Sequence, residues 1–563
     1  MKQSIIEVIE SVAKELFNQD VTVELTRPDI AFGDYATNIA LQLAKPLGKS
    51  PREIAETLAE KVRQNDMFEK VEIAGPGFIN ITVSAQKMAD SLVQNWSENF
   101  GENNDGADKT VVVEFPSPNM AKPYSIGHLR PANQGWAVTQ LMKASGWKVI
   151  SDDHLGDYGA PYGIWVVGFL KFSSDEALEK DGVYELGRVY IETKKALQDE
   201  VAKGEHILAD EVQLWLLKLE AGDTEAVSYS QRFNEISLAH IHHVMNRLHI
   251  HTDYELGEAF FAPQGKAAVQ QLLADNIATQ NDDGSIIVWL KEYGFEVPFL
   301  VQKSNGAALY ATTDLATMLY RETNWQPDRV IHVVGSEQQF YFSQLFALAK
   351  KMGVKTEFIH YWFGMIDQVT DGVREKMSSR KGVVLLEELL DRAEAQAKKI
   401  VADRTVSQAD IEKISLGAIK FSDFMADRRT NILFDWEKIF ALSGYSGPYV
   451  QYAAVRVNKI LHDNPIQGQA ADYDYQAEKA IVATLLDYPD VVRHSARSLE
   501  PHRVALYVYD LAREMNRYYE TTPIATPKVD EGIKNVRLGL LAKVSHVFDH
   551  GLSILGIEVP EKM

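Results

Sequence analysis

The segment SPNMAKPYSIGHLR, residues 117–130, carries residue types that bind phosphate, and it follows the apolar run TVVVEF. A helix beginning near Gly127 would direct free backbone N–H groups at a phosphate, and glycine lets a ligand approach the backbone closely. The His128 imidazole and the Lys122 ammonium could donate to charged oxygens, and the Ser125 hydroxyl could add a weaker hydrogen bond. The segment therefore predicts a nucleotide-phosphate site, although a helix cap with an incidental histidine fits this stretch equally well.

A second basic segment, REKMSSRKG at residues 374–382, could act on the same phosphates. The cations of Lys376, Arg380 and Lys381 could neutralise a polyphosphate, and the hydroxyls of Ser378 and Ser379 could hydrogen-bond to it. Taken alone, so charged a segment is usually a solvated turn. Its place after the last predicted strand of the same domain favours phosphate binding.

Two carboxylates could form a cation site in the same crevice. Glu114 ends the first predicted strand and Asn119 follows it, while Tyr310 and Asp314 lie four residues apart, on one face of a helix. A guanidinium suits two carboxylates best, because its planar fork matches them in bidentate pairs. Taken singly, each acid would be a surface or capping residue, but together they indicate a site for a guanidinium.

Two further motifs do not have the spacing that their chemistry needs. The GKS at residues 48–50 lacks the first glycine of a P-loop, because position 43 is leucine. Residues 240–251, HIHHVMNRLHIH, hold a run of histidines without the HExxH spacing of a zinc site. These histidines are His240, His242, His243, His249 and His251. We therefore expect no zinc and no other protein-bound metal.

Length and composition describe an ordinary globular protein of several domains. The 563 residues correspond to about three or four domains. The absence of cysteine excludes disulfides and thiolate zinc sites, and it fits a reducing cytosol. The net charge of −21 disfavours nonspecific nucleic-acid binding, although a local basic face could still contact RNA. No run of about 18 apolar residues predicts a membrane span, and the charged first helix is no signal peptide.

The order of predicted elements indicates a multidomain α/β and α protein. Residues 1–105 mix helices and strands into an α+β domain, and residues 106–390 contain two βαβ halves of a Rossmann-type parallel sheet, with a helical insertion at about 165–250. Helical spacing then continues through a connector, 391–440, and a C-terminal all-α bundle, 441–563, with no further strand signal.

Taken together, these motifs resemble the arginyl-tRNA synthetase family of class I aminoacyl-tRNA synthetases. SPNMAKPYSIGHLR, HLGDYG, YATTDLA, KMSSRKG, GPYVQYAAVR and GLSILGIEVPEKM occur in the order found in that family and cover essentially the whole chain. The resemblance implies ATP-dependent ligation of L-arginine to tRNA(Arg) through an arginyl-adenylate. It also implies ATP with Mg²⁺ as cofactor, an N-terminal domain at the tRNA corner and D-loop, and a C-terminal anticodon-binding bundle. We expect a cytoplasmic monomer.

The resemblance also implies roles for residues, which we carry over by position. The catalytic residues would be Lys122, His128, Lys376 and Ser125, and ATP would be bound by Gly127, His128, Ser125, Met377, Ser378, Ser379 and Arg380. Arginine would be bound by Glu114, Asn119, Tyr310, Asp314 and Gln338, and tRNA by Asn38, Tyr449, Arg456 and Arg513.

Two departures from the class I signatures bear on the mechanism. Ser125 replaces the first histidine of the HIGH motif, and Ser379 replaces the second lysine of KMSK. Many arginyl enzymes lack that lysine, and we expect Lys122 to supply the missing charge. Around Gln338, residues Gly335, Glu337 and Tyr341 depart from the more common family pattern.

Two other functions compete with this interpretation. One is a class I synthetase for another amino acid, such as lysine. The other is a non-catalytic tRNA-binding paralogue that lost its chemistry with the two missing signature residues. The presence of His128, Lys122 and Lys376 favours a working enzyme over the paralogue.

Overall fold

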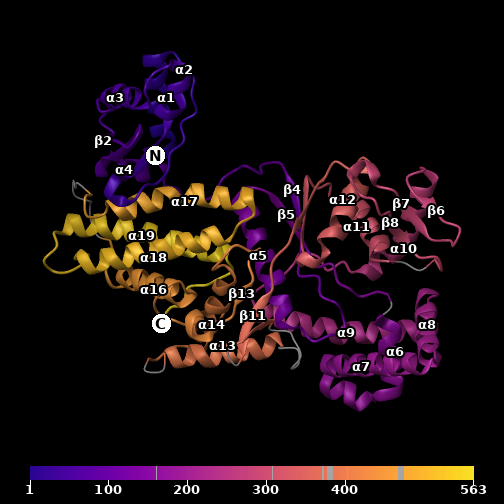
Figure 1. The fold of residues 1–563 in the computed structure, drawn as a ribbon. Coiled ribbons are helices and arrows are strands. Elements are labelled where there is room, and N and C mark those ends of the chain that lie inside the picture. Colours follow the sequence, from indigo (N-terminus) through magenta and orange to yellow (C-terminus); the bar gives the residue numbers. More distant parts are fainter. Residues whose placement is uncertain (160, 307–308, 371–372, 377–384, 402–403, 467–474) are drawn as a thin grey trace. The chain divides into compact units, whose positions relative to one another are not determined.

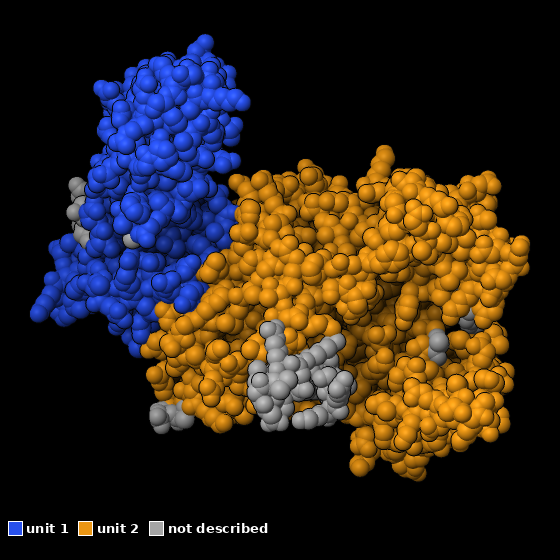
Figure 2. All heavy atoms as spheres, viewed as in Figure 1, with its two compact units in different colours: residues 1–101, 453–491, 507–550 blue, residues 102–452, 492–506, 551–563 orange. Residues whose placement is uncertain are grey.

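The computed structural model describes residues 1–563 except 160, 307–308, 371–372, 377–384, 402–403 and 467–474. The chain forms two compact units (Figure 2): unit 1 comprises residues 1–101, 453–491 and 507–550, and unit 2 comprises residues 102–452, 492–506 and 551–563. Each unit is described separately.

The N-terminal part of unit 1 is an α+β domain built on a three-stranded antiparallel sheet of order β1-β3-β2. Its elements are α1 (Lys2–Phe17), β1 (Tyr35–Thr37), α2 (Ile39–Leu47), α3 (Pro51–Val62), β2 (Phe68–Ala74), β3 (Phe78–Val83) and α4 (Ala85–Asn95), with a 3₁₀ turn at Ile30–Phe32. The helix α3 illustrates how the local sequence specifies these elements. Proline stands at its first position, and its apolar residues Ile54 and Leu58 lie four apart and are buried.

Long helices supply the rest of unit 1 (Figure 1). They are α16 (Gly447–Asp463), α17 (Lys479–Ser498), α18 (His502–Thr521) and α19 (Glu531–Ile554), and parts of all four lie in this unit. Within unit 1, Arg27 of the N-terminal domain binds α17, because its guanidinium donates to Asp487 at 2.6 and 3.0 Å and to the carbonyl oxygen of Ala483 at 3.1 Å.

Unit 2 is organised around a four-stranded parallel sheet of order β10-β9-β4-β5. The strands are β4 (Thr110–Glu114), β5 (Lys148–Asp152), β9 (Arg329–Val333) and β10 (Glu357–Tyr361), and the crossover helices are α5 (Leu129–Ala144) and α12 (Gln339–Lys351). Val111, Val112 and Val113 are fully buried, as expected for a central parallel strand. The strand order reverses between β4 and β9, and in such sheets the ligand lies beyond the carboxyl ends at that point.

Two groups of elements interrupt the sheet. The helices α6 (Pro161–Phe172), α7 (Asp175–Lys203), α8 (Ile207–Glu220) and α9 (Thr224–Arg247) pack together. The second group comprises α10 (Glu258–Ala274), β6 (Thr279–Gln280), β7 (Ile286–Val288), β8 (Phe299–Gln302) and α11 (Tyr310–Asn324), with a 3₁₀ turn at Lys291–Tyr293. The space-filling view shows that unit 2 is hollowed between these two groups (Figures 1 and 2).

The chain beyond β10 is mainly helical. Its elements are β11 (Ile366–Thr370), β12 (Val373–Lys376), α13 (Leu386–Ile400), α14 (Gln408–Asp423), β13 (Ile432–Leu433) and α15 (Trp436–Ile439). The expectation of no strand beyond residue 390 was wrong in one detail, because β13 pairs in parallel with β11. A strand of two residues carries no periodic signal.

The last residues of the sequence pack into unit 2. Lys420 of α14 is fully buried, and its ammonium donates to the carbonyl oxygen of Gly556 at 2.7 Å. Gln451 donates to the carbonyl oxygen of Glu558 at 2.8 Å, and Met563 is buried. Residues 551–563 therefore complete the core around α14.

The predicted fold class is confirmed: an N-terminal α+β domain, a parallel-sheet catalytic domain with a helical insertion, and a helical C-terminal domain. The predicted domain boundaries at 105, 390 and 440 stay predictions, because the two compact units group the chain differently. No helix among the described residues is long and apolar enough to cross a membrane.

Candidate active site

A pocket of about 330 Å³ lies beyond the carboxyl ends of β4 and β9, at the reversal of strand order. One wall is formed by Pro116, Ser117 and residues 125–128, and the opposite wall by residues 333–335 and 363–366. The pocket brings together four of the predicted site residues: Ser125, Gly127, His128 and Gln338. This is the position where a doubly wound sheet binds a nucleotide.

The Ser125–His128 turn is organised by hydrogen bonds between its two ends. Residues Ile126–His128 form a 3₁₀ turn that leads directly into α5. The backbone N–H of Ser125 lies 3.1 Å from Nδ1 of His128, and the ring stacks on Tyr124 with centroids 4.5 Å apart. The Ser125 hydroxyl lies 3.2 Å from the same Nδ1. The side chain at position 125 therefore touches the imidazole, but its backbone makes the shorter contact.

The protonation of His128 follows from this arrangement. Burial lowers the pKa of His128 to about 4. The hydrogen bond with the Ser125 backbone opposes this shift, and the nearby charge of Lys122 adds to it. The ring is therefore neutral at pH 7. With Nδ1 assigned as acceptor of the Ser125 N–H, the ring proton resides on Nε2, which can donate to a phosphate oxygen.

The start of α5 is anchored by a buried ion pair that the sequence analysis missed. Arg130 is 1% exposed and donates to Asp423 at 2.7 Å and to the carbonyl oxygens of Gly364 and Thr430 at 2.7 and 3.1 Å. Asn133 donates to the other oxygen of Asp423 at 3.0 Å. Gly364 lines the pocket opposite the turn, so Arg130 fixes the spacing of the two walls. The sequence offered no clear signal for it, because α5 contains several polar residues and a second charged one, Lys143.

Glu114 is engaged by residues of the protein itself. Its oxygens accept from Arg321 at 2.6 Å and from His332 at 3.0 Å, and the side chain is 5% exposed. Arg321 also donates to Asp152 at 2.7 Å. Burial by itself would raise the pKa of Glu114, but the charges of His332 and Arg321 hold it well below the usual range. The predicted role of Glu114 in arginine binding stays a prediction, because an internal guanidinium already occupies it.

Asp314 lies in a cluster of acids near this internal pair, because His154 is affected by the charges of both Asp314 and Glu114. One oxygen accepts a hydrogen bond from the Tyr341 hydroxyl, and the other lies 3.6 Å from Nε2 of His154. Burial alone would lower the pKa of His154, but Asp314 and the charge of Glu114 raise it to about 9, so the ring is charged at pH 7. The departure from the family pattern at Tyr341 thus supplies a donor to Asp314.

The cluster contains a glutamate that the sequence analysis missed, Glu258, the first residue of α10. It is 7% exposed, and among the described residues no side chain or backbone group donates a hydrogen bond to its carboxyl group. Burial raises the pKa of Glu258 to about 8; the charge of His154 opposes the rise, and those of Asp314 and Asp157 add to it. An acid at a helix start is common for electrostatic reasons, which hid this one from sequence analysis.

The remaining arginine-binding candidates lie at the edges of this cluster. Tyr310 begins α11, and the pKa of its hydroxyl is raised by partial burial and then by the charge of Glu258. Asn119 is exposed and pairs with Gly156 in an isolated bridge between the loops after β4 and β5. Gln338 is exposed and lines the pocket with His128. Their roles stay predictions.

Of the two predicted phosphate cations, the structure describes the side chain of Lys122 but not that of Lys376. The ammonium of Lys122 lies 5.1 Å from the ring centroid of Tyr190 on α7, and burial followed by the charge of Lys194 lowers its pKa. Met377, Ser378, Ser379 and Arg380 lie outside the described residues, as does the side chain of Lys376.

The predicted tRNA-binding residues occupy both units. Asn38 precedes α2 and accepts from Gln42 at 2.9 Å, and Tyr449 is partly buried on α16. Arg456 donates to Asn516 at 2.8 Å, and Arg513 lies near Asp510 at 3.5 Å. These contacts leave the predicted roles untested.

The histidine run pairs with carboxylates instead of gathering around one point. His242 lies 2.7 Å from Glu255, and His249 lies 2.8 Å from Glu558. His243 lies 2.9 Å from Glu387. Across the part of the chain that the structure describes, no group of three or more His, Asp or Glu side chains is arranged to hold a metal ion.

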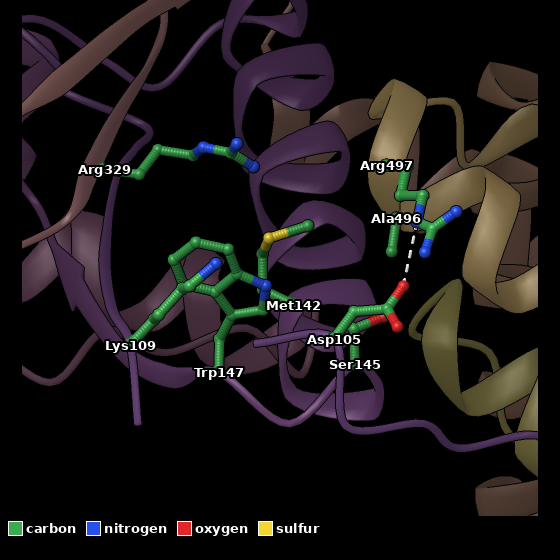
Figure 3. Close-up of a pocket in the computed structure, with 8 residues that line it drawn as sticks. All are labelled: Asp105, Lys109, Met142, Ser145, Trp147, Arg329, Ala496 and Arg497. Atoms are coloured by element: carbon green, nitrogen blue, oxygen red, sulfur yellow. Dashed lines mark hydrogen bonds and ion pairs between the residues drawn. The ribbon is translucent and has the colours of Figure 1, made fainter. Parts of the chain in front are cut away.

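A second pocket, of about 290 Å³, lies at the opposite, amino-terminal edge of the sheet (Figure 3). Lys109 and Arg329 lie over the Trp147 ring at 5.6 and 5.0 Å, and Arg497 pairs with Asp105 at 2.9 Å. Ligands of parallel sheets bind at the carboxyl edge, so this pocket is not the reaction site.

Comparison with known protein families agrees with the site. Residues 87–436 match the family described as "tRNA synthetases class I (R), catalytic domain". Residues 1–83 match "Arginyl tRNA synthetase N terminal domain", and residues 450–563 match "DALR anticodon binding domain".

Individual relatives span the whole length of the chain. A protein of Fusobacterium nucleatum named arginine–tRNA ligase is 32% identical over 98% of this chain and 96% of its own. One of the same name from Lactobacillus delbrueckii subsp. bulgaricus is 34% identical over the full length of both. The arginyl-tRNA synthetase structures from Plasmodium falciparum and Thermus thermophilus share the fold, each with a TM-score of 0.80 at 22% identity, over 100% of this chain and 99% and 100% of theirs. With its signature turn, parallel sheet and full-length relatives, this chain belongs to the arginyl-tRNA synthetase family.

Proposed function

We propose that this arginine–tRNA ligase binds ATP against the His128 turn and the arginine side chain against the acid cluster of Glu258 and Asp314. The observation that carries this assignment is the contrast in that cluster: Glu114 has an internal guanidinium as partner, whereas Glu258 has none among the described residues. A guanidinium from the substrate would complete Glu258 in the way that Arg321 completes Glu114.

In the first step, a carboxylate oxygen of arginine attacks the α-phosphorus of ATP. The new P–O bond forms while the bond from that phosphorus to the β-phosphate oxygen breaks, and pyrophosphate leaves with the electron pair. The reaction requires that the two reactants be positioned and that the charge on the phosphate oxygens be stabilised. His128 fits that task as a neutral donor through Nε2, and its lowered pKa makes it unsuited to act as a base.

In the second step, the terminal 2′-hydroxyl of tRNA attacks the carbonyl carbon of the adenylate. The ester bond forms, the bond from that carbon to the phosphate oxygen breaks, and AMP leaves with the electron pair while its phosphate takes up the hydroxyl proton. We propose that Tyr449, Arg456 and Arg513 contact the anticodon region and that Asn38 contacts the outer corner of tRNA. The three domain matches, to an N-terminal, a catalytic and an anticodon-binding domain, support this division of labour.

Recognition of arginine would rest on buried polar pairs. Lysine lacks the planar fork that two carboxylates can hold, and citrulline lacks the charge. Either would leave the Glu258 and Asp314 carboxyl groups without their full set of donors, which is costly in a buried site. A large discrimination in a single step follows from this chemistry.

The remaining parts of the proposal concern magnesium and context. We propose that Mg²⁺ enters as part of the ATP complex, held by phosphate oxygens, because no group of described side chains is arranged to hold it. We further propose a cytoplasmic monomer. A cysteine-free sequence is compatible with a reducing compartment, and sedimentation of the purified protein tests the monomer.

The assignment of the arginine pocket is tested by charging unfractionated tRNA with arginine, lysine, citrulline and glutamine. We expect the wild-type protein to charge tRNA with arginine alone. The Asp314→Asn variant should have a much higher KM for arginine and an unchanged KM for ATP. An Asp328→Asn variant is the matched control, because Asp328 caps the amino edge of the sheet through the Thr110 N–H. Equal arginine requirements in the two variants would place the guanidinium elsewhere.

A further inference from the structure

We propose that Lys194 of the helical insertion is a phosphate-binding residue of the active site that acts together with Lys122. This inference rests on the proposed function, because it adds a second cation to the site assigned there. Its ligand is a phosphate group of a reactant. The two sources of that group are the β- and γ-phosphates of ATP and the terminal phosphodiester of tRNA.

The two lysines meet on one aromatic ring. The Lys122 ammonium lies 5.1 Å from the centroid of Tyr190, and the Lys194 ammonium lies 5.8 Å from the same centroid. Tyr190 and Lys194 are four residues apart on α7 and so share one helix face. Trp165 of α6 supports the tyrosine ring, with centroids 5.5 Å apart.

Neither ammonium has a carboxylate partner among the described residues. Other lysines of unit 2 do have one: Lys171 lies 2.9 Å from Glu211, and Lys351 lies 2.7 Å from Glu292. Two positive charges that share one ring and no acid repel each other, and partial burial of Lys122 makes the repulsion stronger than in water. An anion between the two ammonium groups would remove that repulsion.

The lysine pair is near residues of both halves of the site. On one side, the charge of Lys122 acts on His128 of the ATP-binding turn. On the other side, partial burial, then Glu258 and then Tyr190 raise the pKa of the Tyr310 hydroxyl at the start of α11, so Tyr190 lies near the acid cluster. The arginine carboxylate and the reacting phosphorus must meet between these two halves, so the pair is close to where phosphates arrive and leave.

Phosphate is the anion that this chemistry favours. An ammonium is a compact point charge with three donors, and it binds phosphate without the planar geometry that a carboxylate–guanidinium pair requires. The signature loop has serine at position 379 where a second lysine would stand, so the site is short of one phosphate cation. Lys122 is expected to supply one charge in its place, and Lys194 would add a second cation from the insertion.

The test compares Lys194→Gln with Lys195→Gln, its exposed neighbour on α7, which has no carboxylate partner among the described residues. Aminoacylation is measured while ATP, tRNA and arginine are varied in turn. We expect Lys194→Gln to raise KM for ATP or for tRNA by about 10-fold, the loss typical of one charged hydrogen bond. The KM for arginine and the thermal unfolding temperature should match the Lys195→Gln control.

The outcomes separate the two sources of phosphate. A rise in KM for ATP alone assigns the pair to the β- and γ-phosphates, and a rise for tRNA alone assigns it to the terminal phosphodiester. Lys194→Arg should restore much of the loss in either case, since it keeps the charge. If both KM values stay within about twofold of the control, a range small beside the loss of a charged hydrogen bond, the inference is wrong.

A Lys122→Ala, Lys194→Gln double variant makes the test independent of the arginine pocket. If the lysines share one ligand, the combined loss should differ from the product of the single losses. Failure of the arginine pocket would change KM for arginine in other variants and leave this coupling intact. Independent effects of the two lysines would overturn the pairing.

Discussion

The proposed ATP side and the proposed arginine side of the active site differ in how they accommodate buried charge. Around the His128 turn, the histidine is neutral, and the buried guanidinium of Arg130 donates to Asp423 and to two carbonyl oxygens. In the acid cluster, Glu258 is buried without a donor, and His154 carries a charge. The comparison indicates that buried charges are paired where the geometry of the turn must be held. A buried carboxyl group without a donor remains where a charged substrate is proposed to bind.

Removing the anchor of the ATP side should have the largest effect. Replacing Arg130 by leucine leaves Asp423 charged and buried, at a cost of about 3 to 5 kcal/mol in the free energy of unfolding. Urea unfolding followed by circular dichroism measures this loss.

The double variant Arg130→Leu, Asp423→Leu is the control, because it leaves no unpaired charge. It should be more stable than Arg130→Leu alone. If the two variants are equally unstable, packing and not charge pairing anchors the turn.

Loss of the imidazole should be the next largest effect. His128→Ala removes the Nε2 donor, and we expect kcat to fall by about 100- to 1,000-fold, by analogy with removal of an oxyanion donor. Pyrophosphate exchange in the presence of tRNA and arginine measures it.

Ser125→Ala provides the contrast at the other end of the same turn. It keeps the backbone N–H that binds Nδ1, so it should be mild. Losses of equal size in the two variants would show that this division of labour between serine and histidine is wrong.

On the arginine side, Glu258→Gln should raise KM for arginine by about 10- to 100-fold, because one carboxylate of a buried charge pair is lost. The KM for ATP should stay the same. Glu296→Gln is the control, since Glu296 is exposed and without a partner among the described residues. An unchanged KM for arginine in Glu258→Gln would remove the asymmetry between the two sides.

The pH dependence of arginine affinity should be the smallest effect, and it is the sharpest test of the contrast between the two sides of the site. With a pKa of about 8, Glu258 is mostly protonated at pH 7, and binding of a guanidinium favours its ionised form. Arginine affinity should therefore rise between pH 7 and 9, by about 10-fold at most, and level off above the pKa. Calorimetry in buffers of different ionisation enthalpy measures the released proton. Glu258→Gln should show no such rise.

The same pKa shift has a consequence for stability. The folded state holds the Glu258 proton up to about pH 8, whereas the unfolded state releases it near the ordinary glutamate value. Between these values the folded state binds more protons, so this residue lowers the free energy of unfolding as pH rises. The free energy of unfolding of Glu258→Gln, taken relative to that of the wild type, should therefore be higher at pH 8 than at pH 5.

The sequence predicted the fold class because it depends on local signals, and the same kind of signal underlies the prediction of a phosphate-binding turn. A buried apolar run before a loop with glycine and histidine marks the turn, and helical spacing marks the C-terminal domain. The pairing of Glu114 with Arg321, 207 residues away, could not be predicted, since no local pattern says which carboxylate an internal guanidinium will take.

Glu258 and Arg130 were missed for a related reason. Their importance comes from burial, and burial of a single charged residue depends on how distant elements pack. Asp314 was singled out because a tyrosine four residues earlier shares its helix face, whereas Tyr254, four residues before Glu258, precedes the helix that Glu258 begins. Local spacing therefore reveals the part of the site that lies on one helix, and only the folded chain reveals the rest.

The hydrogen bond between Lys420 and Gly556 has a bearing on how the protein is made. The two residues are 136 positions apart, and synthesis delivers the lysine first. Until the later residues emerge from the ribosome, α14 exposes a lysine whose partner does not yet exist. Because burial lowers the pKa of Lys420 to about 7, placing it without its acceptor would be unfavourable. The sheet and its crossover helices can therefore assemble early, but the core around α14 has to wait for the distal part of the nascent chain.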